Sequence, residues 1–326
     1  MPAFLEPPVY AAVELGSDSF RLHVGRFESG CLQLVASMTE PVRLAASIDA
    51  DGMLCAAAMR RALACLGEFR AALDAWRPHA TRVVATSALR MARNAALFLP
   101  AAGQALGRPV EIIAGDEAGR LVYMGVASTL DAADAAPRLV LDIGSGATEL
   151  VAGQGAAVRR IETFAVGAVR KSLTFFPDGR IDEISFEAAV RSSRSRFADA
   201  ALGAASWPLA YGACGTVRAL AEIVRQEEGK EEGKEEGQDA RLTQAALARL
   251  RRAFVASGHV ARVRLAWAPA ARVSHLAGGL AILVALMEQL DIAEVVPVHA
   301  GLRVGALWDL HRRTAPAASV DPPGVF

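Results

Sequence analysis

One short pattern occurs twice in this sequence, once beginning at Glu14 and once at Asp142. The two copies read Glu14-Leu15-Gly16-Ser17-Asp18-Ser19-Phe20 and Asp142-Ile143-Gly144-Ser145-Gly146-Ala147-Thr148-Glu149. In each copy an apolar run ends near a carboxylate, the chain reverses through glycine, and a second apolar run follows. Backbone N–H groups and small hydroxyls then face one point, which suits phosphate oxygens, and the carboxylate suits a divalent cation. A single Gly-Ser turn is typical of a hairpin, whereas two copies in duplicated surroundings predict a phosphate site.

The elements around the two copies repeat in the same order. Around the first copy, apolar alternation and helical spacing predict strands at 9–15, 20–27, 31–38, 83–85 and 110–113 and helices at 53–76, 88–106 and 117–127. Around the second copy they predict strands at 139–142, 149–153, 157–163 and 208–211 and helices from 166 and 184. A duplicated β-β-β-α-β-α unit indicates an α/β, two-lobed actin-like (ribonuclease H-like) fold, with the ligand expected in an inter-lobe cleft.

The lobe boundaries follow from composition. An Ala/Asp-rich stretch ending at Pro137 reads as a hinge, which gives a first lobe over 1–130, joined by the C-terminal tail 312–326, and a second lobe over 131–311. Further helices are expected at 242–254, 270–290 and 301–313. The Glu-Glu-Gly-Lys repeat at 227–237 is a low-complexity insert, best interpreted as a solvated loop.

Composition excludes several classes of function. Thirty-five basic residues balance thirty-five acidic ones, so no overall field attracts nucleic acid. No apolar run approaches the roughly 18 residues of a membrane span, and residues 1–10 lack a signal peptide, so we expect a cytoplasmic protein with no membrane partner. The four cysteines are scattered, which is typical of buried thiols rather than of zinc or disulfide sites.

Seven ordered blocks carry a resemblance to a known family. They are AAVELGSDSFRLHVGR (11–26), ATSALRMARNAALF (85–98), AGDEAGRLVYMGVA (114–127), LVLDIGSGATELVAG (139–153), FAVGAVRKSLTFFPDG (164–179), GACGTVRALAEI (212–223) and GGLAIL with GLRVGALWDL (278–283, 301–310). These blocks resemble the exopolyphosphatase and guanosine pentaphosphate phosphohydrolase (Ppx/GppA) family nearly from end to end. The resemblance implies a phosphoanhydride hydrolase that uses Mg²⁺ or another divalent cation, acts on inorganic polyphosphate or guanosine pentaphosphate (pppGpp), and forms a homodimer.

The resemblance also implies roles for individual residues. Asp142 and Glu149 would coordinate Mg²⁺ or orient water, with Glu14 contributing to the metal from the first copy; Glu149 could instead be a solvent-facing strand residue. Guanidinium groups bind phosphate oxygens in pairs of hydrogen bonds. The phosphate-binding set would be Gly16, Ser17, Asp18, Arg90, Arg93, Gly144, Ser145, Gly146, Thr148 and Arg303. Arg21 fits a surface strand as well, and Gly215-Thr216 fits either a nucleotide-binding turn or a helix cap.

Several positions depart from the family pattern. Glu14 and Asp18 replace Asp and Asn, which changes metal geometry and adds charge, while Ser145 replaces a glycine, which matters if φ there is positive. The presumed general-base Glu aligns with Ala118, one residue after Glu117. A step of one residue rotates a helical side chain by about 100°, so Glu117 does not simply take its place.

Three accounts of the chemistry therefore stay open. Glu117 acts as the base after a shift in the helix start, or Asp116 or Asp18 orients the water, or the protein binds polyphosphate or a guanosine alarmone as a regulator without efficient turnover. An actin-like ATPase or sugar-kinase relative is a third class of function. Hydrolysis by a Mg²⁺-dependent exopolyphosphatase is the leading hypothesis, because phosphoryl transfer depends mainly on positioning and charge neutralisation.

Overall fold

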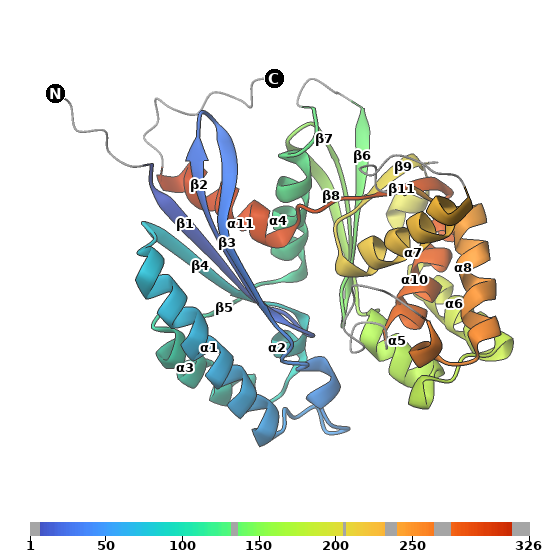
Figure 1. Cartoon of the computed structure of the whole chain (residues 1–326), viewed down its shortest axis with the longest axis horizontal. Helices are drawn as coiled ribbons and strands as arrows, with labels where there is room; N and C mark the ends of the chain where they lie inside the picture. Colours follow the sequence, from blue (N-terminus) through green and yellow to red (C-terminus); the bar gives the residue numbers. More distant parts are fainter. Residues whose placement is uncertain (1–6, 132–135, 205–206, 232–239, 264–274, 315–326) are drawn as a thin grey trace. The chain divides into compact units, whose positions relative to one another are not determined.

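The computed structural model describes residues 7–131, 136–204, 207–231, 240–263 and 275–314. The chain divides into two compact units. Unit 1 comprises Met1–Ala135 and Ala300–Phe326, and unit 2 comprises Ala136–His299. Each unit contains its own β-sheet flanked by helices (Figure 1). No helix in the described ranges combines the length and apolar character needed to span a bilayer.

The sheet of unit 1 has the strand order β3-β2-β1-β4-β5. Its strands are β1 (Val9–Leu15), β2 (Phe20–Glu28), β3 (Cys31–Glu40), β4 (Ala80–Ala85) and β5 (Glu111–Ile112). The first three strands form an antiparallel meander, and β4 pairs parallel to β1. The predicted strands of the first half are confirmed. Because β1 is the central strand, the turn at its end lies at the middle of the sheet edge.

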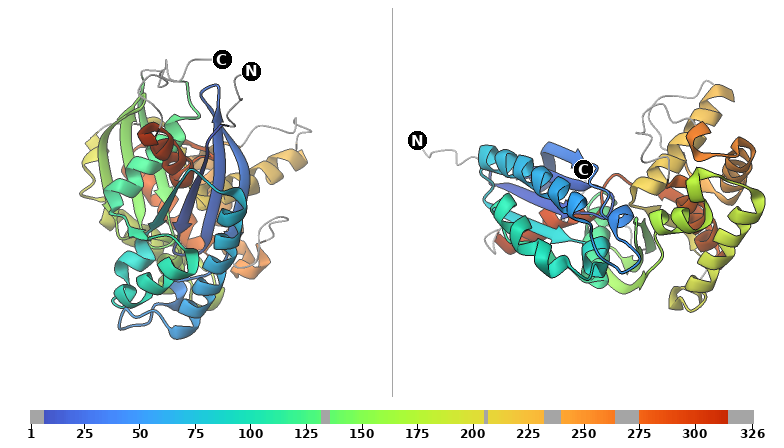
Figure 2. Two further views of the ribbon diagram at one scale, coloured as in Figure 1. Left: turned by 90° about the vertical axis from the view of Figure 1, so that its left-hand side faces the viewer. Right: turned by 90° about the horizontal axis from the view of Figure 1, so that it is seen from below.

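Two layers of helices cover this sheet. Helices α1 (Ala56–Trp76) and α3 (Ala95–Leu106) pack on one face, with the short α2 (Ser87–Met91) between β4 and α3. Helices α4 (Gly115–Ala127) and α11 (Leu302–Thr314) pack on the other (Figures 1 and 2). The apolar face expected for 53–76 is buried in α1 at Leu66, Phe69 and Leu73, so helical spacing correctly identified the core-facing side.

Helix α11 belongs to unit 1, although residues 301–311 were expected in the second lobe. The chain returns to unit 1 at residue 300 rather than at 312. Close approach is the physical reason: a Cβ at Gly305 would collide with the carbonyl group of Leu121 on α4. Asp309 of α11 also forms ion pairs with Arg82 at 3.0 Å and with Arg120 at 2.8 Å. Both interactions join segments far apart in sequence, which local patterns do not reveal.

The sheet of unit 2 has the order β10-β11-β9-β6-β7-β8. Its strands are β6 (Pro137–Ile143), β7 (Thr148–Gln154), β8 (Ala157–Phe164), β9 (Trp207–Gly212), β10 (Leu242–Thr243) and β11 (Ile292–Pro297). An antiparallel meander and a parallel central pair recur in this unit, so the predicted duplication is confirmed. Strands β10 and β11 were not predicted; β10 is only a two-residue strand, and β11 is a short run next to a long apolar helix.

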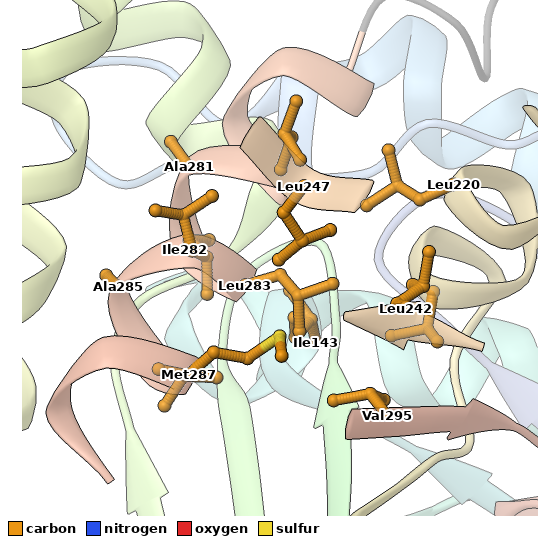
Figure 3. Close-up of a cluster of buried hydrophobic side chains, with 14 of the residues drawn as sticks. Ile143, Leu220, Leu242, Leu247, Ala281, Ile282, Leu283, Ala285, Met287 and Val295 are labelled. Atoms are coloured by element: carbon orange, nitrogen blue, oxygen red, sulfur yellow. The ribbon is translucent and has the colours of Figure 1, made fainter. Parts of the chain in front are cut away.

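The described part of unit 2 has five α-helices, of which the last is strongly apolar. They are α5 (Ala168–Phe175), α6 (Glu183–Phe197), α7 (Gly215–Glu231), α8 (Gln244–Ser257) and α10 (Leu276–Gln289), with short 3₁₀ helices at Pro177–Gly179, Ala201–Ala204 and Val260–Arg262; a further 3₁₀ helix in unit 1 spans Ala45–Ser47. Every residue of α10 from Leu276 to Met287 is buried, as expected for a helix that is apolar on all sides. Figure 3 shows its Ile282, Leu283 and Met287 beside side chains of the neighbouring strands and helices.

The low-complexity insert begins as helix. Helix α7 continues to Glu231, so residues 227–231 are helical rather than part of the expected loop. The rest of the predicted insert, from 232 to 237, lies outside the described residues.

Candidate functional site

Loop 1 (Gly16–Ser19) connects β1 to β2 and is held by the segment that follows β3. The amide of Arg43 donates to the carbonyl of Asp18 at 2.7 Å, and the amide of Ala45 donates to the carbonyl of Ser17 at 2.8 Å. The turn needs glycine at its start, because a Cβ at Gly16 would lie 2.6 Å from the carbonyl oxygen of Ser19. The loop is therefore a fixed, tight reversal.

Loop 2 (Gly144–Ala147) connects β6 to β7 in unit 2 and is held in a comparable way. The amides of Ala168 and Val169, in the first turn of α5, donate to the carbonyls of Gly144 at 2.9 Å and Ser145 at 3.1 Å. Gly167 permits this approach, since a Cβ there would collide with the backbone of Ser145 and Gly146. Here too a segment following the third strand of the unit anchors the loop.

This anchoring fixes the direction of the loop amides. In a trans peptide the N–H group points opposite to the C=O group of the same unit. The amides of Asp18 and Ser19 in loop 1 therefore point away from the segment 43–45, and those of Ser145 and Gly146 in loop 2 point away from α5. Successive N–H groups with one direction suit anion oxygens, so both loops have the backbone geometry of a phosphate-binding turn.

The carboxylate beside loop 1 is neutralised by arginine. Glu14 lies directly opposite Arg21 in the β1–β2 register, and it forms an ion pair with Arg303 of α11. Burial alone would raise the pKa of Glu14, but the charges of Arg303 and Arg21 hold it below its usual value. The structure thus brings together two predicted site residues, Glu14 and Arg303, as partners of each other.

The carboxylate beside loop 2 faces a second carboxylate. Asp142 lies directly opposite Glu149 in the β6–β7 register, a position at which side chains share one face of the sheet with Cβ atoms about 4.5–5.5 Å apart. Glu149 is buried, with 7% of its surface exposed, so it is not a solvent-facing strand residue. The charge of Asp142 also acts on Cys214, in the turn after β9. Burial first, and then the charge of Asp142, raise the pKa of the Cys214 thiol to about 11.

The donor set beside loop 2 fits a hard divalent cation. Like charges in directly opposite strand positions destabilise a sheet, and a cation would offset that repulsion. Mg²⁺ is commonly bound by one or two carboxylates together with waters and substrate phosphates. No cluster of three or more His, Cys, Asp or Glu residues suited to a metal occurs in the described ranges. The pair Asp142 and Glu149 fits Mg²⁺, whereas Glu14, already paired with arginine, fits it poorly.

A buried hydroxyl joins loop 1 to the helix that carries Arg90. The hydroxyl of Ser17 lies 2.8 Å from that of Ser87 and accepts a hydrogen bond from the amide of Ala88 at 2.9 Å. Arg90, in the same short helix, donates to the carbonyl of Ile113 at 2.8 Å. The side chain of Ser17 therefore positions loop 1 against α2. Sequence reasoning missed Ser87, although it lies in a family-like block.

Three other predicted residues are placed less favourably for phosphate. Arg93 is exposed and donates to the carbonyl of Asp51 at 3.4 Å. Thr148 is fully buried and its hydroxyl donates to the carbonyl of Val166 at 2.7 Å. Thr216 donates to the carbonyl of Ile143 at 3.3 Å, at the start of α7. Their roles in ligand binding stay predictions, and the burial of Thr148 favours a structural role for it.

Ser145 is accommodated without backbone strain. It is absent from the non-glycine residues with positive φ, which in the described part of the chain are Ser29, Arg43, Arg77, Asp178 and Asp291. The glycine-to-serine departure in loop 2 therefore leaves the turn intact.

Glu117 is held in an ion-pair network rather than presented to a ligand. Its carboxylate oxygens bind Arg120 at 2.7 and 2.8 Å and Arg82 at 2.8 Å. The hydrogen bond from Arg120 is the largest influence that lowers the pKa of Glu117, to about 2, and Arg82 adds to it against the effect of burial. A carboxylate with so low a pKa is a weak base. The structure thus disfavours Glu117 as the general base.

The neighbouring position offers no replacement. Ala118 is 5% exposed and packs inside unit 1, so a glutamate there would bury a carboxylate. Sequence reasoning missed the network because two of its members, Arg82 and Asp309, lie far from Glu117 in the chain.

Comparison with known proteins assigns the family. A model of the Ppx/GppA phosphatase family matches residues 23–314. The chain belongs to this family. The match includes both ends of the ion-pair network and all of loop 2, so the family assignment covers both units of this Ppx/GppA family member.

Solved structures of similar proteins share the fold. The Ppx-GppA enzyme of Aquifex aeolicus is 23% identical, over 93% of this chain and 100% of that chain, with a TM-score of 0.76. An exopolyphosphatase-like protein is 24% identical, over 95% and 99%, with a TM-score of 0.82. An exopolyphosphatase from Cytophaga hutchinsonii is 21% identical, over 94% and 99%, with a TM-score of 0.83. The predicted actin-like fold with its duplicated unit is thereby confirmed.

Proposed function

We propose that this Ppx/GppA family member hydrolyses the terminal phosphoanhydride bond of inorganic polyphosphate, or of guanosine pentaphosphate, with Mg²⁺ as cofactor. Family membership supports a phosphatase, and an anchored turn with aligned amides in each unit supports a ligand that carries phosphate. The observation that carries the proposal is the facing pair Asp142 and Glu149 beside loop 2, because phosphoryl transfer usually needs a carboxylate-bound cation.

The residues of each unit have distinct tasks in this proposal. The amides of both loops bind phosphate oxygens, and Arg303 and Arg90 supply positive charge in unit 1. Glu149, with Asp142, orients the attacking water. Mg²⁺ held by these two carboxylates would neutralise charge on the reacting phosphate. Glu14 keeps Arg303 in place through their ion pair.

A second candidate is supported by the surroundings of Glu117. Both of its oxygens are engaged by arginine, and the aligned position holds the buried Ala118. Without a general base, hydrolysis would be slower by about 10²–10⁴-fold. A protein that binds polyphosphate or a guanosine alarmone as a regulator, with little turnover, fits these facts.

Release of orthophosphate separates the two candidates. Purified protein is incubated with polyphosphate or guanosine pentaphosphate and Mg²⁺, with the double variant Glu149→Gln, Arg90→Ala as the background. We expect release above that background at high enzyme concentration. Thermal stabilisation by polyphosphate with no release above the background would replace the hydrolase with the binding protein, and the absence of both effects would overturn both candidates.

A further inference from the structure

Lys171 is an unusual basic residue for this chain. Of the 35 Lys and Arg residues, only Lys171, Lys230 and Lys234 are lysines, and the last two lie in the low-complexity insert. Lys171 lies on α5 and is 8% exposed. An amine is thus buried in a chain that otherwise uses arginine, and a lysine, unlike arginine, changes its protonation readily when buried.

The buried amine has polar and aromatic neighbours but no acidic one. Its Nζ donates to the hydroxyl of Ser192 on α6 at 3.0 Å and lies 5.0 Å from the centre of the Phe175 ring. No carboxylate in the described ranges forms an ion pair with Lys171. Helix α10, which also packs on α5, contributes only uncharged residues from Leu276 to Met287.

The charged group that acts on Lys171 has the same sign. Burial, and then the charge of Arg196 on α6, lower the pKa of Lys171 to about 8 from the usual 10.5. Arg196 is exposed and also forms no ion pair with a described residue. Ser192, which accepts the hydrogen bond from Lys171, and Arg196 are four residues apart on α6 and therefore lie on the same face of that helix. The Lys171 side chain is buried there, and Arg196 is at the surface.

Other arginines of this region show the usual arrangement. Arg194 pairs with Glu288 at 3.3 Å, and Arg251 pairs with Glu187 at 2.9 Å. These two pairs are partly exposed, and buried charges in proteins are normally paired as well. A methionine would fill the space of Lys171 without burying a charge, so packing alone does not account for the amine.

We infer that Lys171, Ser192 and Arg196 form an anion-binding site of unit 2, and that its ligand is a phosphate group. A phosphate dianion would offset both positive charges and accept a hydrogen bond from the Ser192 hydroxyl, which already accepts one from Lys171. The site differs from loop 2: the backbone amides of Ala168 and Val169 hold the loop, whereas the side chain of Lys171 binds Ser192 of α6. The inference does not rest on hydrolase activity.

The small number of lysines permits a direct test. Protein with isotope-labelled lysine is titrated with pH by NMR, following the three lysine signals with and without orthophosphate at constant ionic strength. Bound phosphate favours the charged amine, so the pKa of Lys171 should rise by about one unit. Lys230 and Lys234 are internal controls and should not shift. Phosphate at about 50 mM is about ten times the dissociation constant of a weak site that binds in the millimolar range. If the Lys171 signal stays unchanged at that concentration, the inference is overturned.

Two variants locate the site and identify the ligand. Arg196→Ala should weaken the phosphate effect about tenfold or more, whereas Arg191→Ala, which removes another exposed arginine of α6, should leave it unchanged. Tripolyphosphate in place of orthophosphate shows whether the site takes free phosphate or the end of a chain. Equal effects of the two variants would mean general electrostatics rather than a site. Lys171→Met should raise the Tm by about 3 °C in the absence of phosphate. It should also abolish the part of the phosphate-induced rise in Tm that depends on this site. An unchanged Tm together with an unchanged response to phosphate would count against the inference.

Discussion

Loop 1 and loop 2 have a similar backbone geometry, but the side chains beside them differ in charge. Each follows the central strand of its sheet, begins at a glycine and has its carbonyls bound by the segment after the third strand. Five residues after the loop glycine, however, unit 1 has Arg21 and unit 2 has Glu149, each directly opposite the carboxylate of the preceding strand. One topology thus places an arginine opposite the strand carboxylate in unit 1 and a second carboxylate opposite it in unit 2. The backbone suits phosphate in both units, and the side chains decide which of them suits a cation.

The largest expected effect is the difference in activity and Mg²⁺ response between variants of Glu149, beside loop 2, and Glu14, beside loop 1. Glu149→Gln should lower phosphate release by about 10²–10³-fold and reduce the thermal stabilisation produced by Mg²⁺, because it removes one of two facing carboxylates. Glu14→Gln should keep the Mg²⁺ response, since Glu14 is paired with arginine. Phosphate release and Tm with and without Mg²⁺ check this. If Glu14→Gln abolishes the Mg²⁺ response as fully as Glu149→Gln, the two loops act alike and the comparison fails.

Anchoring of loop 2 gives the next effect. Gly167→Ala places a Cβ against the backbone of Ser145 and Gly146, so α5 and the loop must separate. Overpacking of this kind typically lowers the free energy of unfolding by about 1–3 kcal/mol, and phosphate release should be largely lost. Gly67→Ala on α1, where a Cβ meets nothing within 4 Å, is the matched control and should be neutral or stabilising. Normal activity in Gly167→Ala would show that loop 2 does not depend on α5.

The ion-pair network of unit 1 predicts a moderate loss of stability. Glu117→Gln should lower the free energy of unfolding by about 1–2 kcal/mol, because Arg82 and Arg120 lose a charged partner. The pKa of Glu117 is lowered to about 2 from 4.5, so this contribution is present above pH 4.5 and is lost as pH falls towards 2. Denaturant titrations at pH 7 and pH 3 should show the difference between variant and wild type shrinking at pH 3.

The same variant tests the role of Glu117 in catalysis. A fall in phosphate release of less than tenfold agrees with a structural role. A fall of 10²–10⁴-fold at unchanged KM would instead assign Glu117 as the base.

The smallest expected effect compares the equivalent serines of the two loops. Ser17→Ala removes the acceptor of the Ala88 amide and the partner of Ser87, so the free energy of unfolding should fall by about 1–2 kcal/mol. Ser145 is half-buried, and Ser145→Ala should change stability by less than about 0.5 kcal/mol. Chemical denaturation measures both. The reverse order would mean that loop 1 does not depend on its link to α2.

Local patterns predicted the elements that carry both loops. Alternating apolar residues define β1, β2, β6 and β7, and the hairpin register then places Asp142 opposite Glu149 without further information. The partners of Glu14 and Glu117 required the fold, since Arg303 and Asp309 arrive on α11 after the whole of unit 2. Strand β11 escaped notice because its short sequence follows a long apolar helix. Sequence patterns thus indicate which residues form a turn, and long-range packing decides which charges surround it.

The discontinuous course of unit 1 has a consequence for biosynthesis. During translation β1 to α4 emerge first, then all of unit 2, and only afterwards α11 with Arg303 and Asp309. Until that last helix leaves the ribosome, Glu14 lacks Arg303 and the apolar side of α4 lacks its cover. Domains generally fold as units while the chain grows, but here the earlier half must wait for the later one, so nascent chains halted before residue 302 should expose unit 1 to proteases while unit 2 is already protected.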